Sequence, residues 1–173
     1  MGMVEVVYVP RRVADEARRR GLDLEELMLK TLSEALNLDP GVVVEARLEL
    51  AERYLEEARQ RLKEGDAVQA GEKMYRVVEE CVKALSQLYD LPEYRRAAEE
   101  GRWWTRLLGK AARRLARMLN EPRIEFVWGM AYDIHVWGFH EAKYSVEDVS
   151  SDLEHVEWLL RYTREAIERR SKR

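Results

Sequence analysis

The residues of this chain best suited to acid–base chemistry or metal ligation are its histidines. His135 and His140 lie five residues apart, and Glu141 follows directly. Imidazole and carboxylate groups placed together serve proton transfer and metal binding. The surrounding stretch predicts a helix, however, and positions five apart on an α-helix diverge by about 140°. We therefore expect the two imidazoles to point apart, unless Gly138 interrupts the helix and brings them together.

A structural role is the alternative for these histidines, as buried, hydrogen-bonded members of an aromatic cluster. The cluster would consist of Trp128, Trp137 and Phe139. The histidines lack the i, i+4 spacing of helical metal ligands, and the single cysteine rules out a cysteine–histidine zinc pattern. No phosphate-binding loop or dinucleotide fingerprint is present. We predict no catalytic residue, no metal and no cofactor, with His135, His140 and Glu141 as the candidates should an acid–base site exist.

A cationic helix face is the second candidate site. Residues 91–123 carry a net charge of +5 in a chain of −3. The helix expected from Trp103 to Leu119 holds its cations within an arc of about 100°, opposite an apolar face. These cations are Arg106, Lys110, Arg113, Arg114 and Arg117. Trp103 and Trp104 at its start are candidate stacking platforms for bases, although core packing is the more common role of tryptophan.

Like charges at this spacing destabilise a helix unless other groups compensate them. Three kinds of group could neutralise these positive charges: acidic helices of the same bundle, the acidic surface of a second subunit, or the phosphates of RNA, DNA or a nucleotide. The candidate partners of the chain are therefore a second copy of itself, a nucleic acid or another protein.

Composition indicates a well-packed protein. The chain has 173 residues, of which 46% are hydrophobic and 36% charged, and a single cysteine, Cys81. This length suits one domain with a small appendage. Neither a spanning segment nor a signal peptide is recognisable, so we expect a cytoplasmic protein with no membrane partner. Its 23 arginines against 7 lysines, with only five asparagines and glutamines, are typical of proteins from hot environments.

The start of the chain predicts an arm of one strand and two helices. The run Val4-Glu5-Val6-Val7-Tyr8-Val9 favours a strand, which Pro10 ends, and helices are expected over residues 11–20 and 23–38. A single strand has no partner for its backbone groups. We therefore expect it to pair with the same strand of a second molecule, which makes the protein a homodimer. The interface candidates are Val4, Val6, Val7, Tyr8 and Val9. The alternative is an extended arm packed on the bundle.

Beyond the arm the pattern is helical. Asp39-Pro40-Gly41 is the predicted boundary between an arm of residues 1–41 and a bundle of residues 42–173. Apolar residues step by three and four from Leu48 to Leu62 and from Met74 to Leu88, with Gly65-Asp66 between. This pattern predicts an antiparallel helical hairpin. The fold class is therefore all-α: an antiparallel bundle of about four long helices plus a short one, with an N-terminal strand-helix-helix arm.

Residues 3–38 resemble a ribbon-helix-helix unit, in the order strand, proline, helix, glycine, helix. The stretch Val13 to Leu27 is similar to the corresponding part of small antitoxins and repressors. The resemblance implies a dimer whose paired strands enter the major groove of DNA. The outward strand positions offer Glu5 but none of the usual base-reading side chains, and residues 1–40 carry a charge of −2. The resemblance thus favours dimerisation over DNA reading.

Residues 45–145 resemble the archaeal PaREP family. The motifs that carry the resemblance are Tyr54-Leu55-Glu56-Glu57-Ala58, Lys63-Glu64-Gly65-Asp66, Gln69-Ala70-Gly71-Glu72-Lys73-Met74-Tyr75, Glu79-Glu80-Cys81-Val82-Lys83-Ala84-Leu85 and His135-Val136-Trp137-Gly138-Phe139-His140-Glu141. The resemblance implies a bundle related to the HEPN superfamily, one that commonly dimerises, found in thermophilic archaea and without an established activity.

Ribonucleases of that superfamily carry an arginine followed, after four to six residues, by a histidine. No arginine stands at this distance before His135, His140 or His155. We therefore expect a non-enzymatic interaction module, homodimeric and linked to nucleic acid, to a nucleotide or to a toxin–antitoxin-like pair. The alternatives are a ribonuclease with a non-standard site, which uses one of the histidines with an arginine from elsewhere, and a ribbon-helix-helix DNA-binding regulator.

Overall fold

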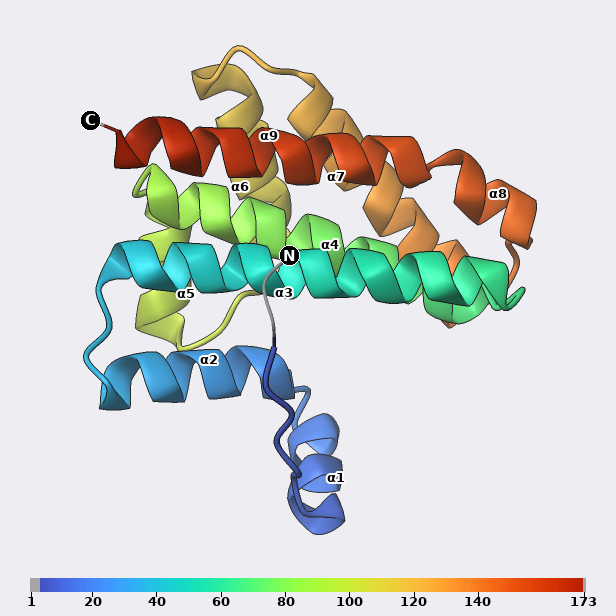
Figure 1. The fold of residues 1–173 in the computed structure, drawn as a ribbon, viewed down its shortest axis with the longest axis horizontal. Helices are drawn as coiled ribbons and strands as arrows, with labels where there is room; N and C mark the ends of the chain where they lie inside the picture. The colour runs from blue at the N-terminus through green and yellow to red at the C-terminus, as the bar shows by residue number, and fades with distance from the viewer. Residues whose placement is uncertain (1–3, 173) are drawn as a thin grey trace.

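The structure, a computed structural model, describes residues 4–172, and every regular element in that range is a helix (Figure 1). The elements are α1 (Arg11–Arg19), α2 (Leu24–Ala35), α3 (Pro40–Lys63), α4 (Ala67–Leu88), α5 (Pro92–Glu100), α6 (Thr105–Met118), α7 (Arg123–Asp133), the π-helix η1 (Ile134–His140), α8 (Val146–Ser151) and α9 (Leu153–Ser171). The predicted all-α bundle is confirmed. Its long helices α3, α4, α6 and α9 form the body, as the sequence indicates.

The centre of the bundle is α4, in which 13 of 22 residues are buried. The predicted hairpin is present, because Gly65 takes a positive φ of 78° and the Asp66 carboxylate accepts a hydrogen bond from the Gln69 N–H at 3.0 Å. Helices α3, α9, α6 and α7 pack around α4. The two core clusters draw all their fully buried members from residues 44–167, and none from the arm.

Side-chain caps also mark the starts of α2, α3 and α8. Asp23 caps α2 by accepting from the Glu26 N–H at 3.0 Å, and Ser145 opens α8 with the capping box that the sequence predicts. Pro40, by contrast, is the first residue of α3 and not a linker, since Asp39 caps the helix through the Gly41 N–H at 2.7 Å. The last predicted helix is two helices, which divide at Asp152.

The predicted strand is wrong for the chain as described. Residues 4–10 are irregular, and no backbone hydrogen bond joins residues 4–9 to another part of the described chain. The physical reason is that a strand needs a second strand, and residues 4–172 offer no other β-segment. Residues 1–3 of the predicted arm lie outside the described range.

The arm meets the bundle through charged side chains more than through apolar ones. Figure 1 shows α2 beside α3 and α1 projecting away from the bundle. Helix α2 has no buried residue. Its Glu26 carboxylate instead accepts hydrogen bonds from Arg47 at 2.7 and 2.8 Å and from Lys83 at 3.2 Å. Asp23 pairs with Arg76, and Arg102 donates to the Gly21 carbonyl at 3.0 Å.

Candidate functional site

A π-helix brings the two candidate histidines together. Over residues 134–140 the backbone widens to a π-helix, in which residues five apart fall on the same side. The Nε2 atoms of His135 and His140 consequently lie 2.9 Å apart. The expectation that the two side chains diverge is therefore wrong, because it assumed α-helical geometry. The alternative, in which the helix is interrupted at Gly138, is closer to the structure, because Gly138 lies within the wider π-helix.

Gly71 makes this arrangement sterically feasible. A Cβ atom on Gly71 would lie 2.9 Å from the Ile134 side chain, closer than real Cβ contacts. The absence of a side chain lets the first residue of η1 rest directly on α4, which sets the next residue, His135, against the following turn of α4. The close contact explains why α4 has a glycine at position 71, although alanine has the better helix propensity.

Glu72 and Tyr75 hold the ring of His135. The Glu72 carboxylate lies 2.9 Å from His135 Nδ1, and because a carboxylate only accepts, Nδ1 carries the proton. The Tyr75 ring stacks on the imidazole with centroids 4.1 Å apart. In the neutral form of His135 the Nε2 lone pair then faces His140, whose Nε2–H is the donor of the contact. Sequence reasoning missed Glu72 and Tyr75, although both stand beside Gly71 in the quoted family motif.

The histidine pair defined by His135 and His140 opens to solvent. His135 retains 20% side-chain exposure, and His140 is exposed. The expected aromatic cluster is only partly present, since Phe139 stacks near His135 whereas Trp137 is 48% exposed. Glu141 caps the end of η1 through its backbone. Among residues 4–172 no arginine makes a hydrogen bond or ion pair with either histidine, and no group of three or more acidic, histidine or cysteine ligands is formed.

Three of the five cations on the cationic face of α6 form ion pairs with acidic residues of the same bundle. Arg114 donates to both carboxylate oxygens of Glu93 at 2.9–3.1 Å. Although burial opposes ionisation of Glu93, the hydrogen bonds from Arg114 hold the pKa of that carboxyl below its ordinary value. Two looser ion pairs complete the set: Arg106 with Glu100 at 3.7 Å, and Arg113 with Glu125 at 3.4 Å.

The two remaining cations of the face, Lys110 and Arg117, are exposed and form no ion pair within the described chain. Of the two tryptophans before them, Trp104 is exposed and Trp103 is half-buried. The Arg102 guanidinium covers Trp104 at 3.8 Å from the ring centroid, and Trp103 packs partly buried against the core. The opposite face of α6 is apolar and buried, as predicted.

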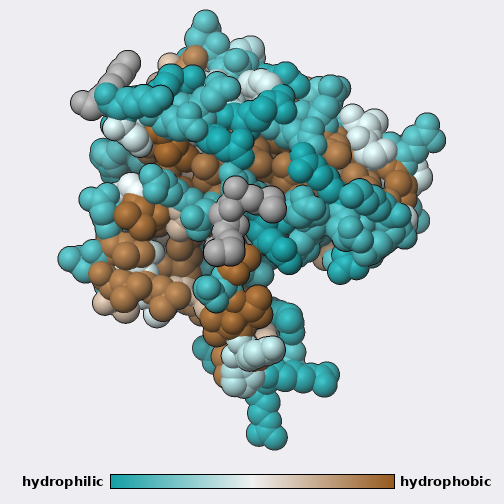
Figure 2. Space-filling view, viewed as in Figure 1, coloured by the Kyte–Doolittle hydropathy of each residue, from teal (hydrophilic) through white to brown (hydrophobic). Residues whose placement is uncertain are grey.

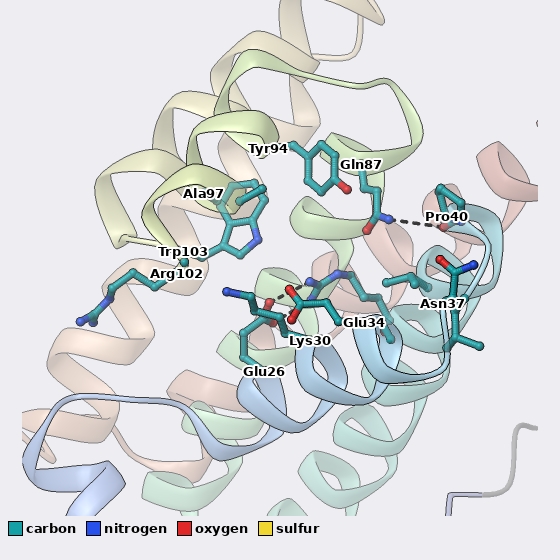
Figure 3. A pocket seen from close by; sticks show the side chains of 16 residues that line it. Glu26, Lys30, Glu34, Asn37, Pro40, Gln87, Tyr94, Ala97, Arg102 and Trp103 are labelled. Carbon is teal, nitrogen blue, oxygen red and sulfur yellow. Dashed lines mark hydrogen bonds and ion pairs between the residues drawn. The ribbon is translucent and has the colours of Figure 1, made fainter.

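A pocket of about 340 Å³ lies where the arm meets the bundle (Figure 3). Lys30 and Glu34 of α2 face Tyr94 and Trp103 across it. Arg47 also lines the pocket, and its buried Nε has no hydrogen-bond partner in the described chain. The wall of the pocket thus carries both positive and negative side chains. The guanidinium of Arg47 already donates hydrogen bonds to Glu26 and Glu80 at 2.7–3.0 Å. The pocket marks an incompletely packed junction between α2 and α5.

The arm presents a large apolar surface. Apolar side chains gather over α2 and beside α1 in Figure 2. The most exposed large ones, which we call the apolar arm face, are Val6, Val7, Tyr8, Val13, Leu27, Leu32 and Leu36, with exposures of 43–95%. The predicted interface residues Val4, Val6, Val7 and Tyr8 are thus exposed, and Val9 is half-buried. Isolated exposed apolar residues are common, whereas these seven all lie in the arm.

Comparison with known proteins relates the bundle to an archaeal family. The pattern of the Archaeal PaREP1/PaREP8 family matches residues 46–160. A crystal structure of a protein from Sulfolobus solfataricus is similar, with 34% identity, a TM-score of 0.63, and coverage of 68% of this chain and 96% of that one. A solution structure of the Orf c02003 protein gives 35% identity, a TM-score of 0.62, and coverage of 69% and 92%. No curated protein matches the chain significantly.

None of the helices within residues 4–172 combines the length and apolar character needed to cross a membrane. The comparisons and the geometry together place the family pattern on the helical bundle. Helices α1 and α2 precede the first matched residue, so the apolar arm face lies outside the family pattern.

Proposed function

The chain belongs to the archaeal PaREP1/PaREP8 family, and from that premise we propose that it is a homodimeric interaction module, in which the family's helical bundle is joined to a second copy through the arm. The observation that carries the proposal is the apolar arm face. Leu32 and Leu36 of α2 are 50% and 64% exposed, although their spacing is that of a helix face that normally packs against another element.

A second copy of the chain is the occupant that fits this surface. Residues 4–9 have no backbone hydrogen bond to the rest of the described chain, and an identical segment across a two-fold axis offers the complementary donors and acceptors. Beside this surface the acids of α1 are paired within the helix, Asp15 with Arg18 and Glu16 with Arg19 and Arg20.

Sedimentation of the full chain at micromolar concentration tests the proposal. We expect a dimer for the native sequence and a monomer for the double variant Val7→Asp, Leu32→Glu, because buried unpaired carboxylates oppose association. Phe126→Glu is the matched control, since Phe126 is 55% exposed but lies on α7, away from the arm. A monomeric native chain, or a dimer that only Phe126→Glu disrupts, would contradict the proposal.

Phosphate binding by α6 is a second candidate function, favoured by the two exposed cations Lys110 and Arg117. Both stay exposed while their neighbours form ion pairs, so they can contact the phosphates of single-stranded RNA. Fluorescence anisotropy at several salt concentrations should show binding that weakens with salt and is lost in Lys110→Glu, Arg117→Glu.

The control for this measurement is Lys63→Glu, Lys143→Glu, which changes the net charge equally at two exposed lysines elsewhere. Equal weakening in both double variants would indicate nonspecific attraction to overall charge. No binding at low salt would leave the ion pairs with Glu93, Glu100 and Glu125 as the full role of the cationic face.

A further inference from the structure

We propose that the histidine pair is a binding site for a divalent transition metal of the zinc type, with Nε2 of His135 and Nε2 of His140 as the two protein ligands. Neutral imidazole nitrogen is a preferred ligand of zinc, nickel and copper. The proposal concerns a face of the bundle remote in sequence from the arm, and it does not depend on dimerisation.

The distance between the two nitrogens suits a shared ion. The Nε2 atoms are 2.9 Å apart. Two zinc–nitrogen bonds of about 2.0–2.1 Å at a tetrahedral angle separate their nitrogens by about 3.3 Å. The required opening of about 0.4 Å is small for His140, because this residue is exposed and is the last of η1. Chelation also requires the two imidazole rings to turn, so that both Nε2 lone pairs point at one ion and no longer at each other.

Glu72 prepares His135 as a metal ligand. Its carboxylate accepts from Nδ1–H at 2.9 Å, which fixes the proton on Nδ1 and leaves the lone pair of Nε2 directed at His140. A carboxylate behind a histidine is the usual outer partner of a metal-bound imidazole, since it sets the ring orientation and raises the basicity of the ligating nitrogen. The stacked Tyr75 ring restrains the same imidazole.

The hydrogen bond between the two histidines must break when the metal binds. With His135 neutral and protonated on Nδ1, the Nε2–H of His140 donates to Nε2 of His135 across the 2.9 Å contact. On metal binding His140 carries its ring proton on Nδ1 instead, and its Nε2 lone pair becomes the second ligand. Both imidazoles stay neutral in this exchange, and the ion replaces one shared proton as the link between them.

The backbone itself argues that the pair is more than a packing contact. A π-helix of seven residues is rare, and such segments occur frequently at functional sites. An α-helix would have kept His135 against Glu72 but would have turned His140 away by about 140°. Gly71, the close contact with Ile134 and the π-helix thus all serve to bring the exposed imidazole of His140 onto the half-buried imidazole of His135.

The coordination sphere would be open. No third histidine, cysteine or acidic ligand joins the pair within residues 4–172, so water molecules would complete the sphere. With two protein ligands in place of the four of a structural zinc site, we expect a dissociation constant of about 1–100 µM.

Isothermal titration of the full-length protein with Zn²⁺ at neutral pH, in buffer free of chelators, tests the proposal. We expect one ion per chain for the native protein and at least a tenfold loss of affinity in His140→Asn, which changes an exposed residue. Glu72→Gln should weaken binding by about 10–100-fold, because it removes the orienting carboxylate but keeps both ligands.

His155→Asn is the matched control. This third histidine faces Arg123 at 3.0 Å and the Phe126 ring, away from the pair, so its removal should leave zinc affinity unchanged. Absence of zinc binding by the native protein up to millimolar concentration would overturn the proposal, as would native affinity in His140→Asn. Circular dichroism of each variant confirms that the helices are retained.

Discussion

Glu26 of the arm makes ion pairs with two cations of the bundle. Its carboxylate is mostly buried and lies between Arg47 and Lys83, which both donate hydrogen bonds to it. Burial by itself raises the pKa of this carboxyl, but the two cations outweigh that effect and lower the pKa to about 2 from its ordinary 4.5. The group therefore stabilises the fold above the unfolded pKa, and the stabilisation is lost as pH falls towards 2.

Glu26→Gln should remove this contribution. At pH 7 we expect a loss of about 3 kcal/mol in the free energy of unfolding, since the pKa difference of about 2.5 corresponds to that energy. Between pH 4.5 and 2 the native protein should lose stability more steeply than the variant, and their unfolding free energies should converge. Urea titrations at pH 7 and pH 3 measure both. Equal acid sensitivity of the two proteins would contradict the role given to Glu26.

Cys81 should be chemically silent in the folded protein. It is 1% exposed, and burial raises the pKa of its thiol to about 12. Because only the thiolate reacts, and three pKa units reduce its fraction about a thousandfold, we expect no labelling by a disulfide reagent at pH 8 within minutes. The same protein in strong denaturant should react fully. Rapid labelling of the folded chain would show that the core around α4 opens readily.

At the scale of elements, local signals in the sequence predicted the helices well. Asp23, Asp66 and Ser145 each bond the backbone of the turn that follows, so their types mark helix starts without knowledge of the fold. The π-helix was not predictable in the same way. Its width depends on the approach of Ile134 to Gly71, a contact between residues far apart in sequence. The i, i+5 spacing of the histidines was its only sequence signal.

Gly71→Ala tests the close approach of η1 and α4. The added Cβ would meet Ile134 at 2.9 Å, so we expect a loss of about 1–3 kcal/mol in stability, despite the better helix propensity of alanine. The control is Gly129→Ala in α7, where a Cβ would meet nothing within 4 Å and should stabilise by up to about 1 kcal/mol. Thermal unfolding compares them. A stabilised Gly71→Ala would show that the contact relaxes without strain.

At the scale of the molecule, the sequence predicted an arm and a bundle but did not indicate how they meet. The apolar spacing of residues 24–36 predicts a packed face, yet Leu32 and Leu36 remain exposed, and no element within residues 4–172 covers them. The bundle, by contrast, contains both sides of each of its packed faces. The apolar spacing within residues 48–88 and in the later helices was therefore enough to predict the helical bundle. The packing of the arm could not be predicted in this way.

Removal of residues 1–38 should leave a folded, helical monomer. Both core clusters draw their fully buried members from residues 44–167, and the cap of α3 by Asp39 stays in place. The truncated chain should still be less stable than the full chain, since the loss of Glu26 leaves Arg47 and Lys83 facing the single carboxylate of Glu80. Sedimentation and thermal unfolding measure both effects.

A second substitution separates this electrostatic cause from a general loss of packing. Lys83→Met should destabilise the full chain, where Lys83 contacts Glu26 and Glu80, but stabilise the truncated chain, where it restores a balanced pair of Arg47 and Glu80. A change in the same direction in both chains would mean that charge balance does not govern the junction. Opposite signs would place the link between arm and bundle in the buried charges of Arg47, Glu80 and Lys83 together with the partly buried carboxylate of Glu26.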